Sequence, residues 1–243
     1  MAECETAYRG LQDPLTVAKV IAALEAEIGL RGLTLEISAD FAAMNQRKLS
    51  LLQERCGPFH DPEVSTLRGD RAFWMALVTP GGQTIALQAF RMDIIDVSLA
   101  DWAPSYTIGL YMRRQELLVP AHTAPPANSI AERLRGRLVY HGELWIDPSH
   151  RKQGLAVPFG RLGLLLSLVK WQPAAIWALA SQSMAMRGGM MRLGYSHQER
   201  GFFRWQMMSG GIDGVEWIAV AERQALEQLA AEIATTPQQY QPA

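Results

Sequence analysis

The stretch IDPSHRKQGLA, residues 146–156, separates two apolar runs and decides which fold and function we predict for the chain. The run before it is typical of a β-strand, and the run after it repeats apolar residues at helical spacing. The turn between them places the cations Arg151 and Lys152 just before the small residues Gly154 and Ala156. The sequence therefore predicts a strand, a turn and a helix in immediate succession.

A turn of this composition is suited to binding an anion. The first four N–H groups of a helix have no partner inside the helix, and this end of the helix is positive. Gly154 lets the main chain approach a ligand closely, while Arg151 and Lys152 add charge. A pyrophosphate group is the ligand that fits best. The alternative is a helix start that merely required a small residue.

The composition of the chain excludes several classes of protein. Of its 243 residues 49% are hydrophobic, as in a globular protein with a real core, and the net charge of -1 favours neither nucleic acid nor a membrane as partner. Cys4 and Cys56 form no metal-binding or disulfide pattern, so we expect a cytoplasmic protein. We expect no signal peptide and no membrane span, because no apolar run approaches the ~18 residues that a span needs.

Periodicity and turn residues predict a mixed α/β fold with one sheet covered by helices. We expect helices at 14–28, 40–55 and 154–170, a methionine-rich one that ends at 193, and a last one that ends near 234. We expect strands at 33–38, 71–78, 84–92, 136–146, 174–180, 202–208 and 215–221. Residues 94–135 are interrupted by prolines and predict an insertion over the sheet, with a short strand at 106–112. The tail 235–243 is expected to be disordered.

The spacing Arg151-x-x-Gly154-x-Ala156 differs from the Rossmann and P-loop glycine patterns. It resembles the Arg/Gln-x-x-Gly-x-Gly/Ala signature of the GNAT acyltransferase superfamily. The longer segment ELWIDPSHRKQGLA, 143–156, is similar to the central strand of that family where it enters the loop for the pyrophosphate of coenzyme A (CoA). Further on, RLGYSHQERGFFRW, 192–205, resembles the family's Leu-Gly-Phe segment before the final strands.

The resemblance implies a mixed, mostly antiparallel central sheet flanked by helices, in which two central strands splay apart and form the CoA cleft. It implies an acyltransferase domain over 31–221, with the insertion at about 94–135. Residues 1–30 would then be an N-terminal helical extension, and 222–243 a C-terminal helix with a flexible tail.

The resemblance also implies acetyl-CoA as co-substrate and no metal. Main-chain groups near Trp145 and Ile146 would bind the pantetheine arm, and amides over 153–157 would hold the pyrophosphate. The Arg151 side chain would brace the loop rather than bind the ligand. The cofactor-binding residues implied in this way are Trp145, Ile146, Arg151, Lys152, Gln153, Gly154, Leu155, Ala156, Val157 and Ser183.

Glu143 is the first candidate for the general base that acetyl transfer to an amine requires. On a regular strand it shares a face with His141 and Trp145, and partial burial beside Trp145 would raise its pKa. The alternative is an ordinary strand carboxylate that faces solvent or pairs with an arginine. His141 is the second candidate, because an unperturbed imidazole already has a suitable pKa, although such a histidine is more often a satisfied polar residue.

The chain departs from the family where many members carry a tyrosine that protonates the departing thiolate. Met190 stands at that position, and the nearest alternatives are Tyr195, Ser183 and Ser181. Three hypotheses follow: another group supplies the proton, water supplies it, or transfer is not the activity of this chain.

The amine acceptor is expected to lie under the insertion. This segment carries cations and aromatic residues that would form either a lid for an acidic or aromatic small molecule or a solvated basic surface. They are Arg113, Arg114, Arg133, Arg135, Arg137, His122, Trp102, Tyr106 and Tyr111.

We therefore predict an N-acetyltransferase that acts on a primary amine of a small molecule and forms, as is common in the family, a homodimer. The alternative is a GNAT-fold module that binds an acyl-CoA, or acts through a partner, with little or no transferase activity. Protein acetylation is a third hypothesis, which the insertion disfavours because it would cover an open peptide groove.

Overall fold

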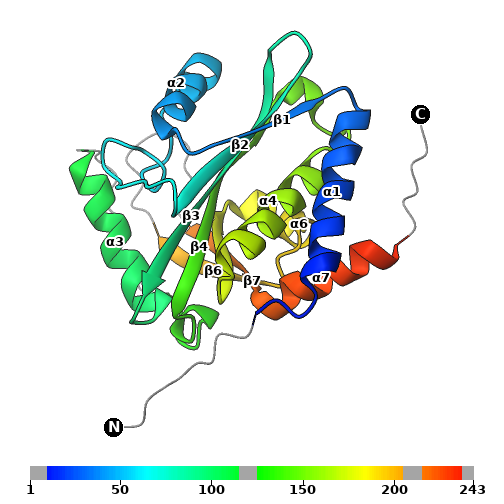
Figure 1. Cartoon of the computed structure of the whole chain (residues 1–243). Coiled ribbons are helices and arrows are strands. Elements are labelled where there is room, and N and C mark those ends of the chain that lie inside the picture. Colours follow the sequence, from blue (N-terminus) through cyan, green and yellow to red (C-terminus); the bar gives the residue numbers. More distant parts are fainter. Residues whose placement is uncertain (1–9, 115–124, 205–214, 237–243) are drawn as a thin grey trace.

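The computed structural model describes residues 10–114, 125–204 and 215–236. In this part of the chain, one seven-stranded sheet has the order β1-β2-β3-β4-β5-β7-β6. Each neighbouring pair is antiparallel except β4 and β5, which are parallel. The expected fold class, a mostly antiparallel mixed sheet flanked by helices, is confirmed (Figure 1).

The strands are β1 Thr34–Ser38, β2 Ala72–Val78, β3 Thr84–Ile95, β4 Gly136–Ile146, β5 Ala175–Ala180, β6 His197–Arg204 and β7 Val215–Glu222. The α-helices are α1 Pro14–Leu30, α2 Phe41–Leu52, α3 Leu99–Arg113, α4 Ala156–Trp171, α5 Gln182–Met186, α6 Gly189–Leu193 and α7 Arg223–Thr235. Two short 3-10 helices, Ile130–Glu132 and Pro148–His150, precede and follow β4.

One face of the sheet is covered by α1, α4 and α7 (Figure 1). Helix α1 begins as predicted, because the Asp13 side chain accepts the Thr16 N–H and Pro14 occupies the first turn. Its apolar stripe, which includes Val20 and Leu24, is buried in the same cluster as Phe159 and Leu162 of α4. The helix that lies outside the GNAT resemblance is thus part of the main core.

The other face carries α2 and α3, which cover separate apolar clusters (Figure 1). Side chains alternate between the faces along β5: Ile176 packs towards α4, whereas Trp177 packs towards α3. The layers are therefore helix, sheet and helix.

The strand predicted at 106–112 is wrong, because this segment lies inside α3. Ser98 caps the helix through the Asp101 N–H, and Leu99, Ala103 and Leu110 form its buried stripe. Pro104 lies within the helix, so the packing of this stripe outweighs the helix-breaking tendency of proline.

The methionine-rich helix expected before residue 193 consists of two short helices, α5 and α6. Gly188 separates them with a φ of 68°, a left-handed conformation that glycine adopts without strain. A Cβ on Gly189 would lie 2.8 Å from the sulfur of Met184, so the second glycine allows the two helices to pack closely. Met190 is buried in the main core.

The remaining boundaries differ by a few residues. Strand β3 extends to Ile95, α2 ends at Leu52, and β6 begins at His197. The tail predicted at 235–243 begins later than expected, because α7 includes Thr235; its residues 237–243, and the end of the strand predicted at 202–208, fall outside the described residues. Among the described helices none has the length and apolar character to cross a membrane.

Candidate active site

The parallel strands β4 and β5 diverge in the middle of the sheet. They pair over three positions that end at Tyr140 opposite Trp177, although β4 continues to Ile146 and β5 to Ala180. The divergence agrees with the splayed strands that the GNAT resemblance implies. Beyond this point, and up to the loop 147–155, the main-chain groups of β4 and β5 do not pair with each other.

A β-bulge interrupts β4 at Glu143. Leu87 of β3 pairs with Trp145 and Ala89 pairs with Gly142, so Glu143 and Leu144 both stand opposite the single residue between them. Glu143 has a φ of 59°, in the left-handed region. The regular strand assumed from the sequence is therefore wrong at this residue.

The bulge places His141 and Glu143 on opposite faces of the sheet, contrary to the prediction that they share one. The His141 ring stacks on Phe90, in the cluster under α4, with 4.4 Å between ring centroids. The Glu143 carboxylate instead points to Lys48 of α2. Trp145 lies on the α2 side, as Glu143 does, and Leu144 packs on the α4 side.

The Glu143 carboxylate is buried and fully engaged. Its Oε2 lies 2.7 Å from Lys48 Nζ, and its Oε1 accepts the Gly57 N–H at 2.6 Å. The Nδ1 atom of His60 lies 3.7 Å from Oε1. Burial alone would raise the pKa of Glu143, but His60 and Lys48 outweigh it and lower this pKa to about 2. The prediction of a raised pKa is wrong: at neutral pH the group is an ion-paired carboxylate.

His60 completes this side of the site. Its ring stacks between Phe41, at 5.8 Å, and Tyr140, at 5.4 Å. A Cβ on Gly142 would lie 2.9 Å from its Cε1 atom, so the glycine in β4 makes room for the imidazole. Burial lowers the pKa of His60, which keeps the ring neutral.

On the opposite face His141 forms a pair with Tyr195. His141 Nδ1 and the Tyr195 hydroxyl are 2.6 Å apart, and both side chains are buried. Burial lowers the pKa of His141 to about 3 and raises that of Tyr195 well above its usual value. The tyrosine hydroxyl therefore stays protonated and donates a hydrogen bond to the neutral imidazole. His141 directly follows the last β4 residue that pairs with β5, so the two groups lie beside the divergence.

The loop after β4 is held in part by contacts within itself and with the end of β4. The Asp147 side chain caps the 3-10 turn through the Ser149 N–H at 2.8 Å. The Arg151 Nε donates to the Ile146 carbonyl at 3.0 Å, a contact that agrees with the bracing role expected for this side chain. Lys152 and Gly154 have φ values of 63° and 74°. Helix α4 then starts without a side-chain cap, which leaves its first N–H groups available to a ligand.

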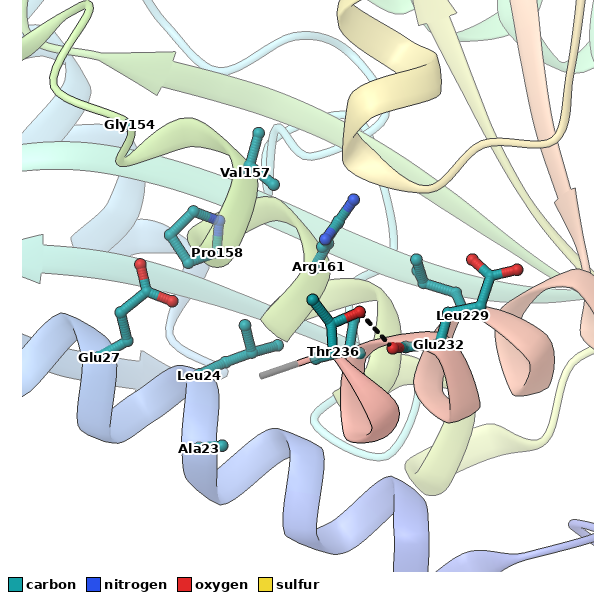
Figure 2. A pocket seen from close by; sticks show the side chains of 11 residues that line it. Ala23, Leu24, Glu27, Gly154, Val157, Pro158, Arg161, Leu229, Glu232 and Thr236 are labelled. Carbon is teal, nitrogen blue, oxygen red and sulfur yellow. Dashed lines mark hydrogen bonds between the residues drawn. The ribbon is translucent and has the colours of Figure 1, made fainter. Parts of the chain in front are cut away.

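The other predicted cofactor residues surround the same turn. Gln153 is exposed and donates from Nε2 to the Ser149 carbonyl at 3.0 Å, whereas Leu155 is buried in the core under α4. Val157 faces a pocket of about 730 Å³ between α1, α4 and α7, which Gly154 also lines (Figure 2). Ser183 is set apart in α5, with its Oγ 3.3 Å from that of Ser181.

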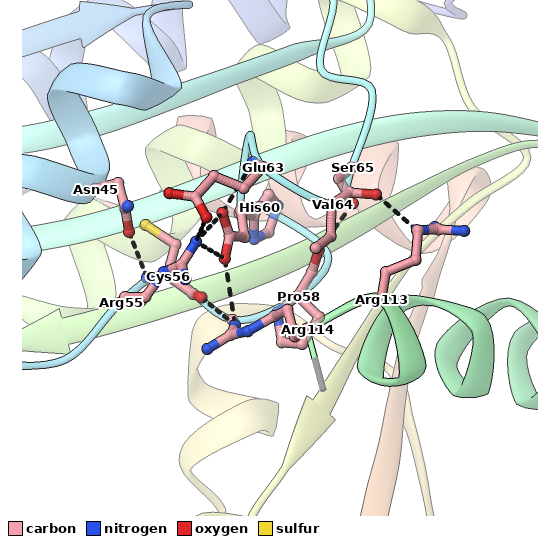
Figure 3. A network of polar contacts seen from close by, with 12 residues as sticks. Asn45, Arg55, Cys56, Pro58, His60, Glu63, Val64, Ser65, Arg113 and Arg114 are labelled. Atoms are coloured by element: carbon pink, nitrogen blue, oxygen red, sulfur yellow. Dashed lines mark hydrogen bonds and ion pairs between the residues drawn. The ribbon is translucent and has the colours of Figure 1, made fainter. Parts of the chain in front are cut away.

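The arginines at the end of α3 bind the protein itself. Arg114 donates to the Cys56 carbonyl at 2.7 Å and lies 3.6 Å from the buried Asp61 carboxylate, and Arg113 donates to the Val64 carbonyl at 3.0 Å (Figure 3). These contacts join the segment 56–65 to the end of α3. Arg114 is thus partly buried among these contacts, whereas Arg113 is exposed and donates to a main-chain carbonyl.

The order of the elements and the divergence of β4 from β5 support the resemblance noted in the sequence. The fold is GNAT-like. Solved structures similar in fold include Arabidopsis thaliana NAA60 in complex with acetyl-CoA, at 16% identity and a TM-score of 0.41, covering 78% of this chain and 99% of that one. A chimera of the spermidine N-acetyltransferase SpeG from Vibrio cholerae and hSSAT is 9% identical, with a TM-score of 0.46, covering 80% and 98%.

Neither the scan against protein-family models nor the search of curated proteins gives a match. Similarities this distant say nothing of the activity or ligands of this chain, so the function proposed below rests on its own residues.

Three side chains of the site were not predicted from the sequence. Lys48 and His60 reach Glu143 from α2 and from the segment after it, and Arg31 reaches the loop from the end of α1. No motif surrounds any of them. One signal could have suggested a role for Lys48. It follows the buried Met44 and Asn45 at helical spacing, so it lies on the side of α2 that faces the sheet.

Proposed function

We propose that the chain is an acyltransferase that moves the acetyl group of acetyl-CoA to a primary amine. The observation that carries the proposal is the position of the loop: it begins where β4 and β5 have separated, and it ends at the uncapped start of α4. Main-chain groups of Trp145 and Ile146 would bind the pantetheine arm, and the amides over 153–157 would bind the pyrophosphate. The remaining predicted cofactor residues lie in or beside this turn, apart from Ser183.

In this reaction the amine nitrogen forms a bond to the carbonyl carbon, and the bond from that carbon to sulfur breaks. One proton leaves the nitrogen and one is gained by the sulfur, so the products are an N-substituted acetamide and free CoA thiol. Glu143 is our candidate for the first proton transfer, because it is an ionised carboxylate at the bulge. The His141–Tyr195 pair is our candidate for the second, because it holds a proton beside the divergence.

A small molecule is the acceptor that we favour over a protein. The segment 56–65 and α3 cover the sheet on the Glu143 side, with Phe59 packed on Tyr140 at 4.3 Å between centroids. Such a cover disfavours a long peptide groove. The homodimer and the cytoplasmic location remain predictions.

Calorimetric titration with acetyl-CoA tests the cofactor site. We expect saturable binding by the wild type and none by Gly154→Trp, which fills the turn. Gly82→Trp is the matched control, because Gly82 is also left-handed, with a φ of 80°, and lies with open space around it in the β2–β3 turn. Loss of binding in both variants would point to general damage, and no binding by folded wild type would remove the proposal.

A non-catalytic acyl-CoA-binding module is the second candidate. Met190, with 4% of its surface exposed, stands where a tyrosine acid is common, and Glu143 is already paired with Lys48. A panel of small amines and peptides, assayed for release of free thiol, separates the two functions. Binding without thiol release for any amine would favour the module.

A further inference from the structure

Helix α1 ends in a contact with the loop before α4. Arg31, which directly follows α1, donates from Nη1 to the Gln153 carbonyl at 2.7 Å, across 122 positions of sequence. Its Nη2 lies 2.9 Å from Glu27 Oε1, one turn earlier in the same helix. The guanidinium is thus held at both ends, by its own helix and by the loop.

The contact falls on the part of the loop where two residues have a left-handed backbone. Lys152 and Gly154 are both left-handed, and a Cβ on Gly154 would lie 3.8 and 3.9 Å from the two terminal nitrogens of Arg31. Arg151 braces the beginning of the loop through Ile146, but Arg31 reaches its end, next to the start of α4.

A planar peptide explains why this contact matters. The carbonyl of Gln153 and the N–H of Gly154 belong to one trans peptide unit, so they point in opposite directions. When Arg31 holds the carbonyl oxygen towards α1, it fixes the Gly154 N–H on the other side of the loop. The guanidinium also offsets the partial negative charge of a carbonyl that would otherwise oppose a nearby anion.

We propose that Arg31 is a positioning residue that keeps the turn at 152–154 in its anion-binding conformation, which gives α1 a role in cofactor binding. This inference rests on the proposed function for its ligand, the pyrophosphate of CoA. The burial of α1 against α4 and α7 makes the support rigid, since Leu24 and Ile28 are fixed in the main core.

The test compares Arg31→Ala and Arg31→Lys with two controls. Glu27→Gln removes the ion pair between Glu27 and Arg31 but keeps the hydrogen bond from Arg31 to the Gln153 carbonyl. Arg133→Ala removes an exposed arginine that pairs with Glu222 at 3.4 Å. In calorimetry we expect Arg31→Ala to raise the Kd of CoA about tenfold, with partial rescue in Arg31→Lys, which can still donate one hydrogen bond. Both controls should stay within about twofold of wild type, because the amide oxygen introduced by Glu27→Gln can still accept a hydrogen bond from Arg31 Nη2.

Truncated ligands separate positioning from direct contact. A misplaced turn weakens the binding of CoA and of 3′-dephospho-CoA by the same factor, because both carry the pyrophosphate. It leaves the turnover of acetyl-pantetheine, which lacks the pyrophosphate, unchanged. If Arg31→Ala weakened CoA but not 3′-dephospho-CoA, the guanidinium would bind the 3′-phosphate itself, and the positioning role would be overturned. An unchanged Kd for CoA would overturn it as well.

Hydrogen exchange of the ligand-free protein keeps this test independent of the proposed function. We expect the amides over 153–157 to exchange faster in Arg31→Ala than in wild type, and the amides in the core of α4 to be unaffected. If the amides exchanged faster in Arg31→Ala but the wild type did not bind CoA, the proposed cofactor would be wrong and the positioning role of Arg31 would stand. If the two proteins exchanged equally and the wild type bound CoA, only the positioning role of Arg31 would be wrong.

Discussion

At the scale of single residues, His60 and Lys48 decide how the carboxylate at the bulge behaves. A buried glutamate without a partner would have a raised pKa and would be protonated near neutrality. With Lys48 at 2.7 Å the group stays ionised, so it can accept a proton only if an incoming amine displaces or shares the lysine. Glu143 is therefore a base whose strength depends on a neighbour.

We expect Glu143→Gln to lower turnover at least about tenfold and to leave the Kd of CoA unchanged, because the carboxylate contacts Lys48 and Gly57 and not the loop. Lys48→Met is the counterpart variant. It should raise the pKa of Glu143 and shift the acidic limb of the pH–rate profile to higher pH. Steady-state kinetics over pH measure both effects, and wild-type turnover in Glu143→Gln would remove Glu143 from the mechanism.

At the scale of secondary-structure elements, α3 shows how context can override local signals. Its sequence contains Pro104 and Gly109, and its β-branched and aromatic residues favour a strand. The helix forms because Leu99, Ala103 and Leu110 lie on one side of it and are buried against the sheet. The partner surface for this stripe is provided by residues far away in the sequence, so propensity within the segment could not predict the helix.

Two substitutions in α3 distinguish the helix from the strand predicted at 106–112. A strand would place Leu110 and Met112 on the same face, whereas the helix buries Leu110 completely and leaves Met112 71% exposed. We expect Leu110→Ala to lower the free energy of unfolding by about 3 kcal/mol, and Met112→Ala by less than about 0.5 kcal/mol. Urea denaturation measures both values, and similar losses in the two variants would contradict the helix.

At the scale of the whole molecule, two buried histidines link stability to pH. The pKa of His141 is lowered from 6.5 to about 3, and that of His60 is lowered as well. The native state therefore binds fewer protons than the unfolded state in this range, and stability present above about pH 6.5 is lost as the pH falls towards 3. Glu143 adds a further loss between about pH 4.5 and 2.

We expect the Tm of the wild type to fall between pH 7 and pH 4, and the Tm of His141→Gln to fall less steeply, because the amide does not titrate. Thermal unfolding in a series of buffers measures the two slopes. The comparison concerns the slope and not the absolute Tm, so a destabilised variant still gives a result. Equal slopes would show that His141 titrates alike in the folded and unfolded states.

The sequence predicted most of the sheet, and the reasons are local. Alternation in β1, the continuous apolar run in β5 and the capped start of α1 each depend on neighbours in the chain. The turn at 151–156 could also be found, because its small and charged residues are contiguous. The environment of Glu143 could not, because it depends on a register shift against β3 and on Lys48, 95 positions away.

The bulge in β4 also makes this strand unusually sensitive to its length. One extra residue sets which way every side chain after it points, so Leu144 and Ile146 face α4 while Trp145 faces α2. Deleting Gly142 would remove the extra residue and turn those three side chains to the wrong layers. The chain would then enter the loop from the opposite side of the sheet, so a change of one residue would invert a whole strand end, whereas a substitution there alters one contact.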